Sequence, residues 1–186
     1  MGEIDEALVR ADEEGFTRPP PSTLLGRVNF LLRQLGSARA VAAELGVTAD
    51  SVNRYRRGAR RNPPPEVARR LEAAVRQRWQ PRVRRRRRRQ AAATRTGITI
   101  ETRARFGYAA APGTTDDDPR FRRLTVHLPP AYAQRLFDAR DTGAPEGRMR
   151  QIVAEGLREV YFQDDGRRAA GLEVEFTGID YLDASF

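Results

Sequence analysis

A dense arginine stretch in the middle of the chain limits what this sequence can fold into. Residues 54–95 contain seventeen arginines and only two acids, Glu66 and Glu72. Six of these arginines are adjacent, at 84–89. Adjacent like charges repel one another and resist burial in a core. The sequence therefore predicts a segment that is solvated, bound to an anion, or both, between two folded regions.

Charge and prolines divide the rest of the chain. Residues 1–16 carry six acids against one arginine, and residues 112–186 carry fourteen acids against ten arginines. Proline triplets at 19–21 and 63–65, with Pro81, interrupt the first half. We predict an acidic, proline-rich segment over 1–21, a helical domain over 22–81, an arginine-rich connector over 82–96 and a small α+β domain over 97–186.

The residue types present narrow the possible chemistry. The chain has 186 residues, no cysteine and one histidine, His127, so disulfides, thiolate metal sites and histidine triads are not expected. No apolar run approaches the ~18 residues of a membrane span, which predicts a cytoplasmic protein with no membrane partner. All 34 basic residues are arginine, and the formal net charge is +9. Guanidinium groups suit phosphate binding because they are planar and bond two oxygens at once.

Hydrophobic periodicity separates a helical first half from a second half that contains strands. Before Pro81, apolar residues recur at spacings of three and four, which predicts helices. Their expected limits are Ser22 or Thr23 to Gly36, Ser37 to Gly46, Thr48 to about Gly58, and a fourth helix after the prolines at 63–65. After residue 96, alternation predicts strands near 98–108, 124–128 and 172–176, with helices near 130–140 and 146–162.

Residues 38–57 fit a twenty-residue helix-turn-helix. Ala42 is the small residue at the helix crossing, and Gly46 is the turn residue. The five apolar positions that lock the two helices are Val41, Leu45, Val47, Val52 and Tyr55. An ordinary αα-hairpin in a helical bundle is the alternative interpretation.

In a helix-turn-helix the second helix enters the major groove, with its early residues near base edges. The predicted base-edge residues are Ala49, Asp50, Ser51, Asn53 and Arg54. The predicted phosphate contacts are Arg56, Arg57, Arg60, Arg61, Arg82, Arg84, Arg85, Arg86, Arg87, Arg88 and Arg89. For the arginine run, an RNA-binding arm, a membrane-surface patch, a solubilising linker and a nuclear import signal are alternatives.

The segment 109–119 is predicted to be a loop that presents two hydroxyl groups. Thr114 and Thr115 follow Gly113 and precede three adjacent aspartates. No neighbouring base is visible that would activate a threonine. The residues alone fit a hairpin loop with turn chemistry, or a weak acidic metal site at 116–118.

Several strings in the chain resemble the telomere-protecting terminal proteins of linear actinomycete chromosomes and plasmids. They are RWQPRV at 78–83, ETRARFG at 101–107, APGTTDD at 111–117, LPPAY at 128–132, EVYF at 159–162, LEVEFT at 172–177 and DYL at 180–182. The resemblance runs along the whole chain.

The resemblance implies a protein that becomes covalently attached to the 5′ ends of a linear replicon. A threonine hydroxyl accepts the first deoxynucleotide, which maps onto Thr114 or Thr115, with Thr114 favoured. The implied partners are telomeric DNA (its single-stranded 3′ overhang, its duplex, or both), a telomere-associated DNA-binding protein and a DNA polymerase. The chain itself would be no enzyme and need no cofactor, because the polymerase site supplies the divalent metal and the deoxynucleoside triphosphate.

Two other function classes share part of this pattern. A helix-turn-helix transcriptional regulator, with a C-terminal effector or dimerisation domain, needs no accessible threonine and forms no covalent adduct with DNA. An enzyme acting on nucleic acid is disfavoured, since no acid–base or metal constellation is evident. The threonine segment and the chemistry of any DNA adduct distinguish these classes.

Overall fold

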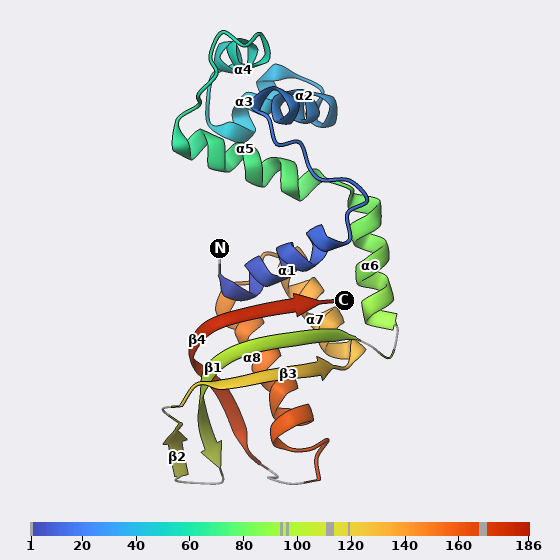
Figure 1. The fold of residues 1–186 in the computed structure, drawn as a ribbon, viewed down its shortest axis with the longest axis vertical. Helices are drawn as coiled ribbons and strands as arrows, with labels where there is room; N and C mark the ends of the chain where they lie inside the picture. The colour runs from blue at the N-terminus through green and yellow to red at the C-terminus, as the bar shows by residue number, and fades with distance from the viewer. Residues whose placement is uncertain (1, 94, 96, 111–113, 119, 168–170) are drawn as a thin grey trace. The chain divides into compact units, whose positions relative to one another are not determined.

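The chain forms two compact units, one helical and one containing both helices and an antiparallel sheet (Figure 1). The computed structural model describes residues 2–93, 95, 97–110, 114–118, 120–167 and 171–186, with 110 and 114–117 described by their backbone alone. The helical unit is Thr17–Pro81, and the α/β unit combines Met1–Phe16 with Arg82–Phe186.

The helical unit contains α2 (Leu24–Leu35), α3 (Ala38–Leu45), α4 (Ala49–Arg56) and α5 (Pro65–Arg78). The predicted caps are confirmed: the hydroxyls of Thr23, Ser37 and Thr48 accept N–H groups in the first turns of α2, α3 and α4. One apolar core joins the four helices. Its most enclosed members are Val28, Leu31, Val41, Leu45, Val52, Tyr55, Leu71 and Val75.

The sheet of the α/β unit is built around β1 (Ile98–Ala110). β1 pairs antiparallel with β2 (Thr114–Asp117) and β3 (Arg122–Leu128) on one side, and with β4 (Glu173–Ser185) on the other. The alternation predicted for 98–108 is confirmed, since Ile98, Ile100, Ala104 and Phe106 are buried while Arg103 and Arg105 are exposed. β4 extends well past the predicted 172–176, and register shifts against β1 accommodate its length.

Helices cover one face of this sheet. α7 (Pro130–Asp141) and α8 (Glu146–Leu157) lie behind it in Figure 1, and α8 continues into a π-helical turn, Arg158–Phe162. Leu136, Phe137, Ile152 and Leu157 from these helices pack with the inward side chains of the strands. The mixed character predicted for the second half is therefore correct.

Two further helices fall where the sequence predicted separate segments. α1 (Glu3–Glu14) lies in the predicted acidic segment, and α6 (Pro81–Ala93) lies in the predicted connector. Ile4, Ala7, Leu8 and Ala11 of α1 and Ala91 of α6 belong to the core of the α/β unit. Each fully buried Ile or Leu contributes about 1.5–3 kcal/mol, so Ile4 and Leu8 hold α1 against that unit.

Candidate nucleic-acid interface

The second helix of the predicted helix-turn-helix is α4, which follows α3 after a short turn. Gly46 ends α3 in the left-handed conformation, at φ +66°, which glycine adopts without steric cost. Ala42, Val41, Leu45, Val52 and Tyr55 are buried, and Val47 is partly buried against the same core. The turn and the apolar contacts therefore fix α4 by one face and leave its other face to solvent.

The predicted base-edge residues lie on the solvated side and near the start of α4. Asp50 and Arg54 are exposed and form an ion pair at 2.9 Å across one helical turn. Ala49, Ser51 and Asn53 are half-buried, and the Ser51 N–H donates to the capping hydroxyl of Thr48 at 3.2 Å. In the free protein, Arg54 is thus held beside a carboxylate that a DNA contact would have to displace.

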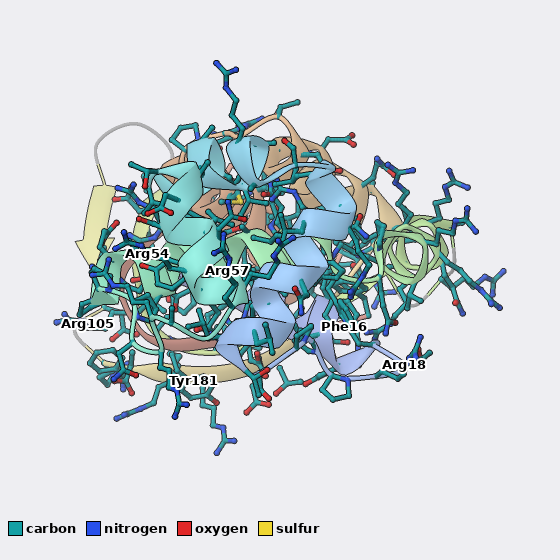
Figure 2. The ribbon with its side chains drawn as sticks, turned by 90° about the horizontal axis from the view of Figure 1, so that it is seen from above. Phe16, Arg18, Arg54, Arg57, Arg105 and Tyr181 are labelled. Atoms are coloured by element: carbon teal, nitrogen blue, oxygen red, sulfur yellow. The ribbon has the colours of Figure 1, made fainter. Side chains whose placement is uncertain are left out.

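The arginines at the end of α4 form an exposed group. Arg56, Arg57, Arg60 and Arg61 are all solvent-exposed, and Figure 2 labels Arg54 and Arg57 on this helix and its exit. The Arg60 guanidinium lies 5.8 Å from the centre of the Tyr55 ring. We name the set Arg54, Arg56, Arg57, Arg60 and Arg61 the α4 arginines.

The arginine run of α6 is not uniformly solvated. Arg82, Arg85, Arg86 and Arg89 are exposed, whereas Arg84, Arg87 and Arg88 are partly buried against the α/β unit. The exposed four are spaced by three, one and three residues, so they form one stripe along the helix. We call Arg82, Arg85, Arg86 and Arg89 the outer stripe, and Arg84, Arg87 and Arg88 the inner arginines.

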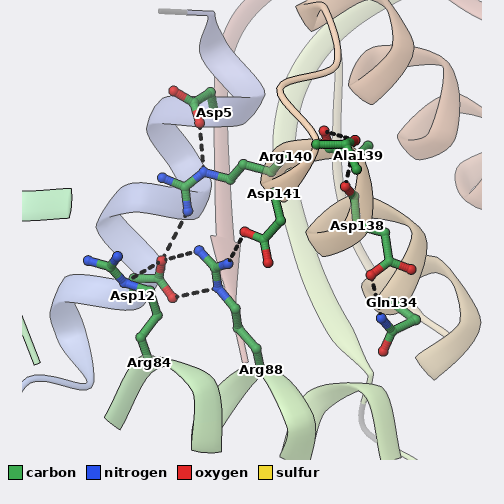
Figure 3. A network of polar contacts seen from close by, with 10 residues as sticks. Asp5, Asp12, Arg84, Arg88, Gln134, Asp138, Ala139, Arg140 and Asp141 are labelled. Carbon is green, nitrogen blue, oxygen red and sulfur yellow. Dashed lines mark hydrogen bonds and ion pairs between the residues drawn. The ribbon is translucent and has the colours of Figure 1, made fainter. Parts of the chain in front are cut away.

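The inner arginines have intramolecular partners, and Figure 3 shows most of them. Asp12 on α1 is almost fully buried. Its Oδ2 forms ion pairs with Arg84 Nε at 3.2 Å and with Arg88 Nη2 at 2.6 Å. Arg140 of α7 contacts the same carboxylate at 3.0 Å and Asp5 at 2.7 Å, while Arg88 also reaches Asp141 at 2.9 Å. Arg87 donates to the carbonyl of Ala11 at 2.7 Å. Arg84, Arg87 and Arg88, which the sequence predicted as phosphate contacts, thus have partners within the protein.

Burial and ion pairing act differently on two of these guanidinium groups. Burial lowers the pKa of Arg84, and the charge of Asp12 offsets that effect only in part. Burial also acts to lower the pKa of Arg88, but its hydrogen bond and charge interaction with Asp12, together with Asp141, outweigh burial and raise it. Interactions with carboxylates therefore offset the effect of burial more fully for Arg88 than for Arg84.

Sequence reasoning missed α1 and Asp12, although a signal is present. Ile4, Ala7, Leu8 and Ala11 recur at spacings of three, one and three, the pattern of a helix with one apolar face. Asp12 lies four residues after Leu8 and therefore on that same face. An acid on an apolar face requires a buried cation as partner, and the arginine run supplies it.

The predicted priming residues lie where the C-terminal end of β1 pairs with β2. Thr114 and Thr115 belong to β2, with their backbones opposite Ala110 and Ala109 of β1. The predicted loop 109–119 is thus partly strand, since Ala109 and Ala110 end β1 and 114–117 form β2. Residues 111–113 and 119 lie outside the described residues. Asp118 begins the return to β3, and its N–H donates to the carbonyl of Phe106 at 3.1 Å.

His127 lies on the solvated face of β3, as its position in the alternation predicted. Its side chain is exposed, and its Nδ1 lies 2.7 Å from the hydroxyl of Thr99 on β1.

In comparisons with known proteins, no family model, no curated protein and no solved structure matches the chain. Among the described residues, no helix is long and apolar enough to cross a membrane.

Proposed function

We propose that this chain is a DNA-binding terminal protein that primes DNA synthesis at the end of a linear replicon. The observation that carries the DNA-binding part is the separation of exposed from neutralised arginines. The α4 arginines and the outer stripe are exposed to solvent, whereas the inner arginines are engaged by Asp12 and by backbone carbonyls. Exposed guanidinium groups gathered in this way are suited to binding phosphates, because each can bond two oxygens at once.

In this proposal α3 and α4 act as a helix-turn-helix, and α4 enters the major groove of duplex DNA. Asn53 and Arg54 lie on a helix whose opposite face is fixed by Val52 and Tyr55 in the core. Both side chain types bond base edges, asparagine to adenine and arginine to guanine. Arg56, Arg57, Arg60 and Arg61, at the end of the helix, would hold the phosphate backbone.

The priming part of the proposal is supported by the resemblance of the chain to actinomycete terminal proteins. The Thr114 hydroxyl would attack the α-phosphorus of a deoxynucleoside triphosphate. A new oxygen–phosphorus bond forms, the bond to the β-phosphate oxygen breaks, and pyrophosphate leaves, while the hydroxyl proton passes to a base in the polymerase site. The partner polymerase supplies the metal ions, so this chain needs to present only the acceptor oxygen.

The decisive experiment is transfer of a labelled nucleotide to the protein. The full chain is incubated with labelled deoxynucleoside triphosphates, a divalent metal, a polymerase source and telomeric template, and then denatured and separated by size. We expect label on the native protein, none on Thr114→Ala, and nearly native labelling of Thr115→Ala. Cleavage of the linkage by strong alkali distinguishes a threonine ester from a tyrosine ester, which resists it.

Other outcomes change the proposal in defined ways. If only Thr115→Ala abolishes labelling, the acceptor is the neighbouring threonine and the mechanism holds. If the double alanine variant is still labelled, the acceptor lies elsewhere and this part of the proposal is wrong. Sequence-specific duplex binding without any covalent adduct would instead favour a transcriptional regulator.

A further inference from the structure

The sheet of the α/β unit has a second face that the described helices leave to solvent. α7 and α8 lie behind the strands in Figure 1. Along β3 the inward residues Leu124, Val126 and Leu128 are buried, whereas Arg123 and His127 are exposed on the other side. We call this other side of β1, β3 and β4 the open face.

Two aromatic rings lie on the open face. Phe121, just before β3, is 42% exposed, and Tyr181 of β4 (labelled in Figure 2) is 36% exposed. They are two of the four large hydrophobic side chains that are exposed among the described residues. The guanidinium groups of Arg103 and Arg105 lie 5.1 and 5.0 Å from the centre of the Phe121 ring and hold it in place. Aromatic residues and arginines are enriched where proteins bind one another.

Charges on the open face form two adjacent rows of opposite sign. In the acidic row, Glu101 of β1 lies opposite Asp183 of β4. In the basic row, Arg103 of β1 lies opposite Arg123 of β3. Residues two apart in a strand are about 6.6 Å apart along it, so the two rows are neighbours on the face.

The charges of this region nearly cancel. Level with residues 99–105 of β1, the strands present three described charges of each sign: Arg103, Arg105 and Arg123 against Glu101, Asp180 and Asp183. At the edge of the face, Arg10 of α1 adds one positive charge and pairs with Asp183 at 3.2 Å. Such a surface gives a polyanion little electrostatic attraction, but it meets a second copy of itself without strong net repulsion.

One oxygen of Glu101 remains open to a partner. Its Oε1 accepts the Tyr181 hydroxyl at 2.7 Å and an Arg123 N–H at 2.8 Å. Among the described residues, no hydrogen bond or ion pair reaches its Oε2. A carboxylate accepts about four hydrogen bonds, so Glu101 can bind one more guanidinium and keep both of these contacts.

We propose that the open face is the interface of a homodimer, in which two copies pack face to face with their β1 strands antiparallel. A two-fold axis that crosses β1 at Thr102, midway between the rows, places the acidic row of each copy over the basic row of the other. Glu101 then faces the partner's Arg103, and Arg103 faces the partner's Glu101, so the ion pair occurs twice. Packed sheets lie about 10 Å apart, a gap that a glutamate and an arginine span together.

The charge rows favour this arrangement over the other symmetric one. If the two-fold axis ran along β1, Arg103 would face the partner's Arg103 and Glu101 the partner's Glu101, and both contacts would be repulsive. An axis across the strands also reverses the order along β3. Phe121, before the start of β3, then approaches the partner's His127, near the end of that strand. The same interface would therefore cover the exposed ring of Phe121.

The test is self-association of the full chain without nucleic acid, measured by sedimentation velocity from about 1 to 100 μM. We expect the native chain to approach twice its mass of 21.0 kDa as the concentration rises. Glu101→Arg or Arg103→Glu places like charges face to face in both pairs, so each should weaken dimerisation at least tenfold. Arg148→Glu reverses an exposed charge on α8 and should change the dissociation constant less than twofold.

A mixture of the two charge variants makes the test independent of their individual effects on the fold. In a mixed dimer the introduced arginine of one variant faces the introduced glutamate of the other, and the native Arg103 and Glu101 face each other. Equimolar Glu101→Arg and Arg103→Glu should therefore associate at least tenfold more tightly than either variant alone. Phe121→Ala changes no charge and should also weaken dimerisation, because it removes a covered ring.

Three results would overturn the proposal. They are a native chain that stays monomeric over the whole range, single variants that all dimerise like the native chain, and folded charge variants that associate no better when mixed. Neither DNA nor the acceptor threonine enters these measurements, so this interface and the proposed function can fail separately.

Discussion

The inner and outer faces of α6 carry the same residue type in the same helix, yet their environments are opposite. On the inner face, Arg84 and Arg88 converge on the buried carboxylate of Asp12. On the outer face, Arg82, Arg85, Arg86 and Arg89 are exposed to solvent. The difference shows that an arginine within a charge run is paired or solvated according to whether its side of the helix packs against the rest of the unit or is exposed to solvent.

The geometry of the inner face explains how so many arginines share a helix. Arg84 and Arg88 are four residues apart, and like charges at that spacing destabilise an isolated helix. One carboxylate between them converts this repulsion into two ion pairs, and Arg140 joins the same carboxylate from α7. Asp5 and Asp141 complete the cluster with one acid for each arginine. The tertiary contact, rather than helix propensity, therefore stabilises this part of α6.

Removal of Asp12 should be the most damaging single change in this comparison. Asp12→Ala leaves three partly buried guanidinium groups without the carboxylate that they share. Breaking a buried ion pair from one side typically costs about 3–5 kcal/mol of unfolding free energy. Urea denaturation of the full chain, followed by circular dichroism, measures the loss.

The matched control is Asp183→Ala in the same unit. Asp183 pairs with Arg10 at 3.2 Å, but about half of each side chain is exposed. Surface pairs of this kind contribute about 0–1 kcal/mol. Equal losses in the two variants would contradict a structural role specific to Asp12.

The outer stripe should show the reverse behaviour. Replacing Arg82, Arg85, Arg86 and Arg89 with glutamine should leave the unfolding free energy nearly native, because these side chains are exposed. If each binds one phosphate, the log–log salt dependence of duplex affinity should fall by about 0.9 per contact, or roughly 3.6 in all. Between 50 and 200 mM salt, the native chain would then lose about a hundredfold more affinity than the variant. Titrations of duplex DNA at several salt concentrations measure this slope, and an unchanged slope would make the stripe a spacer.

Substitutions in α4 distinguish sequence reading from phosphate binding. Asn53→Ala or Arg54→Ala should weaken binding to a preferred duplex by about 1–3 kcal/mol, with a smaller effect on scrambled DNA. The effect of Arg54 includes release of Asp50, its partner in the free protein. Competition titrations with the two duplexes give the ratio of the affinity for the preferred duplex to the affinity for scrambled DNA. Equal weakening on both would mean that α4 contacts only the backbone.

Sequence patterns predict the parts of this fold that depend on local chemistry. Thr23, Ser37 and Thr48 cap helices as their positions indicate, and the alternation of β1 identifies its buried face. The patterns fail where a residue's role depends on a distant partner. Asp12 and Arg88 are 76 residues apart, and neither segment alone shows that the other neutralises it. The pairing of β1, β3 and β4 likewise brings the exposed rings of Phe121 and Tyr181 to one face of the sheet, which no single segment indicates.

Asp118 is a less buried counterpart of Asp12, with a side chain that is 10% exposed, and should give the smallest effect. Its Oδ1 accepts the backbone N–H of Arg120 at 3.0 Å, and its Oδ2 accepts from Arg122 at 2.7 Å. The backbone N–H of Arg120 and the guanidinium of Arg122 together lower the pKa of Asp118 to about 2. An unfolded aspartate titrates near 3.9.

Because the folded pKa is the lower one, the contribution of Asp118 to stability is fully present above about pH 4. It is lost as the pH falls toward 2. Several other carboxylates titrate in the same window, so the informative quantity is the difference between native and Asp118→Asn. That difference in urea midpoint should be largest at neutral pH and should shrink between pH 4 and pH 2. A difference that stays constant over this range would show that the carboxylate acts through packing and not through its charge.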